Sequence, residues 1–156
     1  MNDDFTVLRE AIKTALNGIK DGGGPFGAII TREGMIIARA CNRVVLSHDP
    51  TAHAEVLAIR EASEKLGTHD LSGCVLYASC EPCPMCLGAV YWSGIRRVVY
   101  AAGREDAAAA GFNDSFIYSE MNLDPVERKI SFIRLPDAGG DEPFREWVQF
   151  GDRIPY

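Results

Sequence analysis

Three side chains that commonly bind zinc stand in two short segments of this 156-residue sequence. His53 lies within residues 51–55 (TAHAE), and Cys83 and Cys86 are separated by two residues within residues 81–86 (EPCPMC). Zinc binds imidazole and thiolate, and a catalytic zinc typically keeps three protein ligands and leaves the fourth position for water. The sequence therefore predicts one zinc ion per chain, held by these three residues.

Glu55, two positions after His53, is the candidate acid–base residue. Consecutive helical positions are rotated by about 100°, so the two side chains do not share a helix face. Both can serve one metal-bound water only if the metal lies over the end of the helix. This spacing therefore predicts a site at a helix terminus.

The remaining cysteines leave other interpretations open. Cys80 could join the three predicted ligands in a closed Cys₃His site with a purely structural role, and a CxxC pair could also be redox-active. Cys41 and Cys74 fall in strand-like segments and are predicted to belong to the core.

Composition restricts the class of protein. The chain has 16 Lys and Arg against 22 Asp and Glu, a formal net charge of −6, which disfavours an extended nucleic-acid surface. Hydrophobic residues make up 47%, which excludes intrinsic disorder. The length predicts a single domain over residues 1–156.

Neither a leader nor a membrane segment is predicted. The first four residues are acidic at positions 3 and 4, unlike the basic start of a signal peptide. The longest uncharged stretch, residues 82–95, is shorter than the roughly 18–20 residues of a membrane span. We expect a cytoplasmic protein.

Hydrophobic periodicity and turn residues predict alternating helices and strands. These are a helix at 3–20, strands at 27–31 and 35–39, a helix at 52–66, a strand at 74–78, a helix at 84–93 and a strand at 95–100. The order indicates an α/β sheet covered by helices. It places Cys83 and Cys86 at a helix N-terminus, where the helix dipole favours thiolate.

Beyond residue 103 the pattern is weaker. An alanine-rich stretch at 107–110 precedes short predicted helices near 115–121 and 142–150, with extended chain at 130–133. We interpret 103–156 as a C-terminal extension that contributes to the substrate pocket and to a dimer contact.

The combination of His53-Ala54-Glu55 with residues 82–86 (PCPMC) resembles the zinc-dependent cytidine deaminase superfamily. The resemblance implies a three-layer α-β-α sandwich, with a central mixed sheet and helices on both faces. It also implies a hydrolytic deaminase, in which water activated by zinc attacks the amine-bearing carbon of the substrate and Glu55 shuttles protons.

Four further segments resemble bacterial guanine deaminases: residues 23–27, residues 88–92, residues 111–118 and Tyr156. This implies conversion of guanine to xanthine and ammonia in purine catabolism. The resemblance also implies a homodimer, in which exchange of the tails would let Tyr156 cap the other subunit's pocket. Guanosine, cytosine, an aminotriazine and a tRNA adenosine remain alternative substrates, and a zinc-stabilised binding protein without catalysis remains an alternative function.

The same resemblance assigns substrate contacts. Asn42 would hydrogen-bond the base with both its donor and its acceptor. The backbone N–H of Ala54 would donate to a carbonyl oxygen. Phe26 and Trp92 would contact the flat ring, and Tyr156 would close the pocket.

Asp114 is the remaining residue that the resemblance assigns. Guanine carries N–H donors at N1 and at its C2 amine, which an acceptor carboxylate matches. Asp114 would therefore recognise the substrate and relay protons to the departing ammonia, although an Asp before a short helix can also be simply its N-cap. Position 113 is Asn here, where relatives often carry a second acid, which leaves a secondary contact open.

Overall fold

The computed structural model describes residues 3–156, and the chain divides between Asp114 and Ser115 into two compact units. The first unit contains α1 (Asp4–Lys20), β1 (Gly27–Arg32), β2 (Met35–Cys41), α2 (Val44–Ser47), α3 (Ala54–Leu66), β3 (Cys74–Cys80), α4 (Pro84–Trp92), β4 (Arg97–Ala102) and α5 (Arg104–Ala109).

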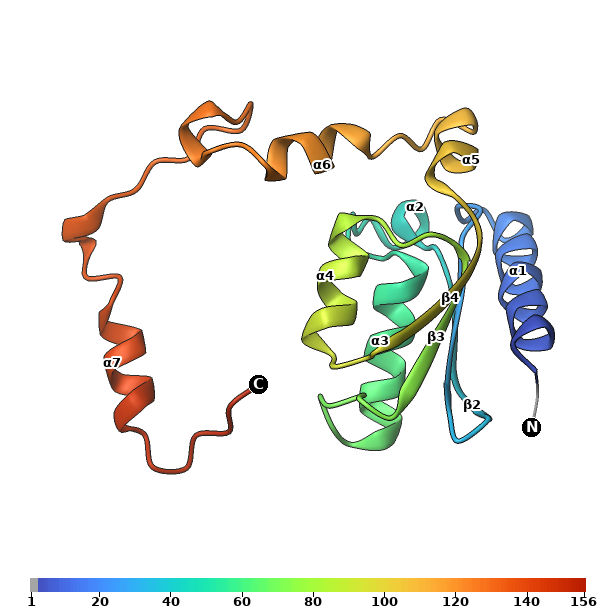
Figure 1. Ribbon diagram of the computed structural model, residues 1–156, viewed down its shortest axis with the longest axis horizontal. Coiled ribbons are helices and arrows are strands. Elements are labelled where there is room, and N and C mark those ends of the chain that lie inside the picture. Colours follow the sequence, from blue (N-terminus) through green and yellow to red (C-terminus); the bar gives the residue numbers. More distant parts are fainter. Residues whose placement is uncertain (1–2) are drawn as a thin grey trace. The chain divides into compact units, whose positions relative to one another are not determined.

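The four strands of the first unit form one mixed sheet in the order β2-β1-β3-β4. β1 is antiparallel to both of its neighbours, whereas β3 and β4 run parallel. Helix α1 covers one face of the sheet, and α3 and α4 lie on the other face (Figure 1). The predicted α-β-α arrangement with a mixed sheet is confirmed.

The core follows the alternation of side chains along the central strands. Ile29 and Tyr77 face α1, whereas Ile30 and Leu76 face α3. The contact surface of α3 consists of small residues that are 0% exposed: Ala54, Ala58 and Ala62. Small side chains allow this helix to pack closely on the sheet.

The start of α1 is fixed by two aspartates. Asp3 caps the helix, and its side chain accepts a hydrogen bond from the N–H of Thr6 at 2.7 Å. Asp4 forms an ion pair with Arg97 of β4 and accepts a hydrogen bond of 2.8 Å from the hydroxyl of Tyr77 in β3. The bond from Arg97, and then that from Tyr77, lowers the pKa of Asp4. These contacts attach the first turn of α1 to the sheet.

The second unit contains α6 (Ser115–Met121), the 3₁₀ turns η1 (Pro125–Glu127) and η2 (Pro136–Ala138), and α7 (Glu142–Gln149). The two predicted helices are confirmed. Residues 130–133 form no strand. None of the residues 115–156 is buried, so this unit has no core of its own.

Several predicted boundaries were wrong. α3 begins at residue 54 instead of 52, because His53 has an extended conformation and is the N-cap. β4 lies two residues later than predicted, because Arg97 is the partner of Val75 in the sheet; Ile95 is buried before the strand starts.

Two helices were not predicted. α2 has only four residues, too few for a periodic pattern, and α5 contains the alanine-rich stretch. Alanine has the highest helix propensity, and the Asp106 side chain accepts a hydrogen bond from the N–H of Gly103 at 2.8 Å, which closes the first turn of α5. Across residues 3–156, the helices are all too short or too polar to span a bilayer.

Candidate metal centre and active site

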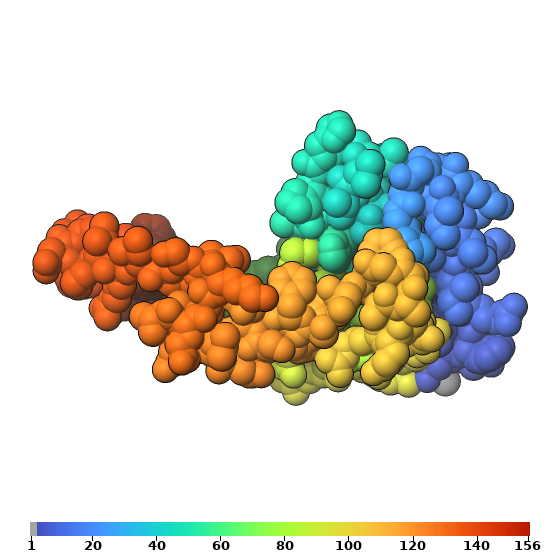
Figure 2. Space-filling model, turned by 90° about the horizontal axis from the view of Figure 1, so that it is seen from above, coloured from blue at the N-terminus to red at the C-terminus, as the bar shows by residue number. Residues whose placement is uncertain are grey.

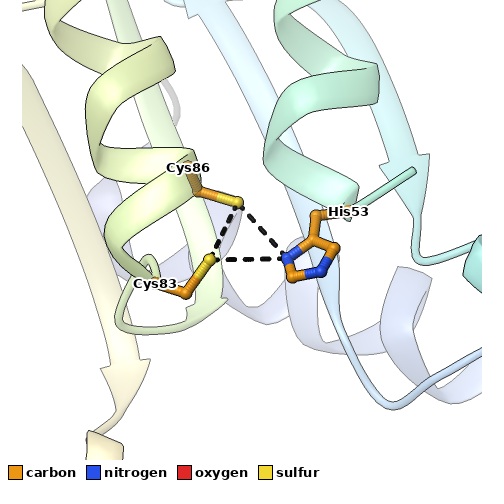
Figure 3. A group of neighbouring side chains, drawn as sticks. All are labelled: His53, Cys83 and Cys86. Atoms are coloured by element: carbon orange, nitrogen blue, oxygen red, sulfur yellow. Dashed lines mark hydrogen bonds between the residues drawn. The ribbon is translucent and has the colours of Figure 1, made fainter. Parts of the chain in front are cut away.

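Two helix N-termini position the predicted zinc ligands. His53 is the N-cap of α3 and Cys83 is the N-cap of α4, with Pro84 following as its first residue. Cys86 lies in the first turn of α4 and is 0% exposed. Figure 3 shows the imidazole and the two thiols pointing toward one another between the two helices. The predicted placement at helix ends is confirmed.

The three ligand atoms form a nearly equilateral triangle. The Nδ1 atom of His53 lies 3.5 Å from the Sγ atoms of both Cys83 and Cys86, and the two Sγ atoms are 3.6 Å apart. In a tetrahedral zinc site with bonds of about 2.3 Å to sulfur and about 2.0 Å to nitrogen, these separations would be about 3.6 Å and 3.8 Å. The side chains therefore fit a zinc ion with little rearrangement.

Hydrogen bonding within the triangle favours the thiolate form of Cys83 and the thiol form of Cys86. The bond with Cys86, followed by the bond with His53, lowers the pKa of the Cys83 thiol to about 4. The bond with Cys83, together with burial, raises the pKa of Cys86. A bound dication would hold both sulfurs as thiolates, because metal ligands must be deprotonated.

Glu55 is buried beside the triangle. It is the second residue of α3, is only 5% exposed, and its Oε2 accepts a hydrogen bond from the thiol of Cys86 at 3.4 Å. Burial raises the pKa of Glu55, which favours its protonated form. His53 and Glu55 both reach Cys86 because His53 precedes the helix. The two side chains therefore meet at the N-terminal end of α3, as their spacing in the sequence requires.

Cys80 lies outside this group. Among residues 3–156, the cluster of potential ligands within 4.8 Å of one another consists of His53, Cys83 and Cys86. The thiol of Cys80 donates instead to the carbonyl oxygen of Gly103 at 3.6 Å. This arrangement supports a three-ligand centre over a closed Cys₃His site. Cys74 is buried in the core as predicted, whereas Cys41 is only half-buried.

Asn42 lies directly after β2 and is 7% exposed. Its Oδ1 accepts a hydrogen bond from the N–H of Val44 at 3.2 Å. The next residue, Arg43, donates its N–H to the carbonyl oxygen of Ala52 at 2.9 Å, one residue before His53. Asn42 is therefore held near the segment that carries the predicted ligand. Ala54 is the first residue of α3, where the N–H has no partner within the helix.

The other predicted substrate contacts have different surroundings. Phe26 packs edge-to-face on Phe112, with ring centroids 5.0 Å apart, and both rings line an apolar cavity of about 340 Å³. Trp92 ends α4 and is 72% exposed. Asp114 is half-buried and ends the first unit, and Tyr156 is 83% exposed in the second. The roles of these residues stay predictions.

Residues 1–102 match the family described as the cytidine and deoxycytidylate deaminase zinc-binding region. The chain belongs to this deaminase family. The matched region includes all three candidate ligands and Glu55, so the zinc-binding character of the family applies to the triangle described above.

Three relatives help to place this deaminase within its family. Guanine deaminase of Bacillus subtilis is 50% identical over 97% of each chain. Its solved structure superimposes with a TM-score of 0.96, covering 100% of this chain and 99% of the other. A tRNA-specific adenosine deaminase of Bacillus subtilis is 45% identical over 90% of this chain and 86% of its own. A structure in complex with 2,6-diaminopurine is 40% identical, with a TM-score of 0.71 over 73% of this chain and 64% of the other.

Sequence reasoning missed the surroundings of Asn42. The glycines at 22–24 follow α1 and overlap the segment 23–27 that resembles guanine deaminases, but neither observation predicted that Gly23 and Gly24 pack directly against this asparagine. One glycine is enough to end a helix. The two additional glycines were the available signal that another segment approaches the loop closely.

A three-ligand centre predicts that zinc binding requires Cys83 and Cys86 but not Cys80. Cys83→Ala should weaken zinc binding by more than about 100-fold, because loss of an outer-shell partner alone costs about 10–100-fold. Cys80→Ala should retain one zinc per chain. Zinc content after dialysis against a weak chelator, measured by atomic absorption, distinguishes the two variants.

Equal loss of zinc from Cys80→Ala and Cys83→Ala would support the closed structural site. The circular dichroism spectra of both variants serve as the control for folding.

Proposed function

We propose that this chain is a guanine deaminase that hydrolyses guanine to xanthine and ammonia, as a step of purine catabolism. The observation that carries the proposal is the 50% identity to a guanine deaminase over nearly the full length of both chains. The ligand triangle and the buried Glu55 supply the groups that such a hydrolysis needs.

His53, Cys83 and Cys86 would hold the metal. When bound, zinc acts as a Lewis acid that lets water lose a proton near pH 7. Glu55 would take a proton from the attacking water as the water oxygen bonds to the amine-bearing carbon, and would deliver it to the adjacent ring nitrogen of guanine. It would then assist cleavage of the C–N bond, which releases ammonia. Its burial supports this role, because a carboxyl group with a raised pKa can both take up and give back a proton.

Asn42 and Ala54 orient the base. The amide of Asn42 offers a donor and an acceptor to the purine edge, and the N–H of Ala54, at the positive end of α3, donates to the carbonyl oxygen. Phe26 and Trp92 contact the ring. Asp114 accepts hydrogen bonds from the N1–H and the C2 amine of guanine and relays a proton to the leaving group.

The second unit supports a homodimer with exchanged C-terminal segments. Helix α7 has one apolar face, formed by the exposed side chains of Phe144, Trp147 and Val148. Figure 2 draws the second unit in orange to red. A unit with no buried residue must cover such a face against another surface to be stable. We propose that a second copy provides that surface, and that Tyr156 closes the partner's pocket.

The protein is proposed to act in the cytoplasm on a free base. The five free cysteines suit a reducing compartment. The net charge of −6 gives little support for a tRNA substrate.

Glu55→Gln tests the acid–base assignment. The variant should lower kcat for guanine by at least about 10²–10⁴-fold, because it removes the proton carrier while preserving side-chain shape, and it should retain zinc. Glu64→Gln, on the exposed side of the same helix, is the matched control with unchanged kcat. Ammonia release measures the rate.

The same assay with guanosine, adenine, adenosine, cytosine, cytidine and an aminotriazine tests the substrate. Guanine should give the highest kcat/KM. A zinc-loaded enzyme that releases no ammonia from guanine would refute the proposed function, and release from another member of the panel would replace guanine with that compound. Retained activity in Glu55→Gln would remove Glu55 from the mechanism.

Asp114→Asn separates catalysis from helix capping, because Asn caps helices about as well as Asp. If Asp114 contacts the base, the variant should lower kcat/KM for guanine by about 10²-fold or more while its melting temperature stays unchanged. Asp137→Asn, the same change at an exposed position, is the control with unchanged kcat/KM. Unchanged kcat/KM in Asp114→Asn would leave this carboxylate with a capping role alone.

The apolar face of α7 predicts a dimer in solution. Light scattering should give the mass of two chains, and Trp147→Glu should give one chain, because a charge cannot be buried there without a partner. Gln149→Glu, on another side of α7, should remain a dimer. A monomeric wild-type mass would contradict the proposed assembly.

Mixed subunits test the exchange itself. Glu55→Gln and Tyr156→Ala should each have low activity as homodimers. After unfolding and refolding together, an exchanged heterodimer contains one intact Glu55 site capped by an intact Tyr156, so activity should rise. Activity equal to the average of the two homodimers would exclude exchange.

A further inference from the structure

The loop that joins α1 to β1 packs around Asn42. The N–H of Gly23 donates to the carbonyl oxygen of Gly18 in α1 at 2.8 Å, and the N–H of Asn42 donates to the carbonyl oxygen of Phe26 at 2.9 Å. These bonds fix the loop to the end of α1 on one side and to residue 42 on the other. Gly23 and Gly24 of this loop are therefore held at a fixed distance from Asn42.

The Asn42 side chain is itself held in one orientation. It is almost fully buried, and its Oδ1 receives the N–H of Val44 at 3.2 Å. An amide group is planar, with its oxygen and its NH₂ on opposite edges. A fixed Oδ1 consequently fixes the direction in which the NH₂ donates.

Gly24 leaves the space that this orientation requires. A Cβ atom at residue 24 would lie 2.9 Å from the Oδ1 of Asn42 and 3.0 Å from its Cγ. Gly24 has no positive φ, so its backbone conformation is open to alanine. A side chain at residue 24 is therefore excluded by the position of the Asn42 amide and not by the backbone conformation of residue 24.

Neighbouring glycines differ in this respect. A Cβ at Gly23 would lie 2.3 Å from the carbonyl oxygen of Asn42, and a Cβ at Gly27 would lie 2.3 Å from the carbonyl oxygen of Ala11. Those contacts involve backbone, which cannot move without disturbing the fold. The three nearest atoms at Gly24 all belong to the Asn42 side chain, so an added methyl group would displace the amide from its orientation while the backbone stays in place.

We propose that Gly24 is a positioning residue that sets the orientation of the Asn42 amide, and thereby the affinity of the site for its purine base. The proposal rests on the proposed function and deepens it. It predicts that an added methyl group at residue 24 changes substrate binding while the fold and the metal centre are preserved.

Gly24→Ala is the first test. The variant should bind one zinc per chain and lose no more than about 2–4 °C in melting temperature, because only a side-chain amide has to move. Its KM for guanine should rise about tenfold with a smaller change in kcat, as expected when binding energy shared by the ground and transition states is lost. Gly73→Ala, whose Cβ would meet only the Nε of Arg32 at 3.8 Å, is the control with unchanged kinetics.

A double-mutant cycle tests whether the effect passes through Asn42. In Asn42→Ala the two conflicting atoms are gone, and of the three atoms nearest to the new Cβ at residue 24 the Cβ of residue 42 remains, at 3.4 Å, an ordinary contact. Adding Gly24→Ala to Asn42→Ala should therefore change KM by less than about twofold. An equal rise of KM in both backgrounds would overturn the proposal.

A measurement without substrate keeps this proposal separate from the proposed function. In ¹⁵N-labelled protein, Gly24→Ala should shift the Nδ2–H resonances of Asn42, and Gly73→Ala should leave them in place. Unshifted resonances would refute the positioning role whatever the enzyme acts on. Shifted resonances in a protein without guanine activity would retain the Gly24–Asn42 contact and reject only the substrate.

Discussion

The structure depends on bringing two thiols and an imidazole within about 3.6 Å of one another without burying an unpaired charge. Two helix N-termini meet this requirement, because each offers unpaired N–H groups and a positive dipole end to a thiolate or a carboxylate. Cys83 and His53 are the caps of their helices, so their side chains leave the helices at the ends and can meet between them. Glu55 then enters the same group from the first turn of α3.

The meeting of the two ends is maintained by packing further away. The alanines of α3 seat this helix closely on β1 and β2, and α4 follows β3 after a connection of only three residues. The N–H of Glu81 donates to the carbonyl oxygen of Ala102, which extends the pairing of β3 and β4 up to that connection. Rigid elements on both sides hold the reactive groups within the tolerance that catalysis needs.

The candidate metal centre and the exposed apolar face of α7 lie in different units of the chain. Among residues 3–156, the three candidate metal ligands and Glu55 lie at the starts of helices α3 and α4 in the first unit, which contains the buried core. The second unit has apolar side chains along α7 and no buried residue. Such a segment gains stability only by covering another surface, which is why the assembly and the closing of the pocket are proposed together.

The sequence by itself predicted the candidate metal ligands, the candidate acid–base residue and the order of the main helices and strands, because each prediction depends on local spacing, on a short motif or on periodic burial. It could not set the start of β4, where Ile95 is buried without being in the strand, nor predict α2, which is shorter than any periodic pattern. The tertiary structure alone decided that Cys80 bonds to Gly103 and stays outside the metal group, and that Gly24 lies against Asn42. Both outcomes depend on distances between segments that are far apart along the chain, and these are set only when the sheet and its helices pack together.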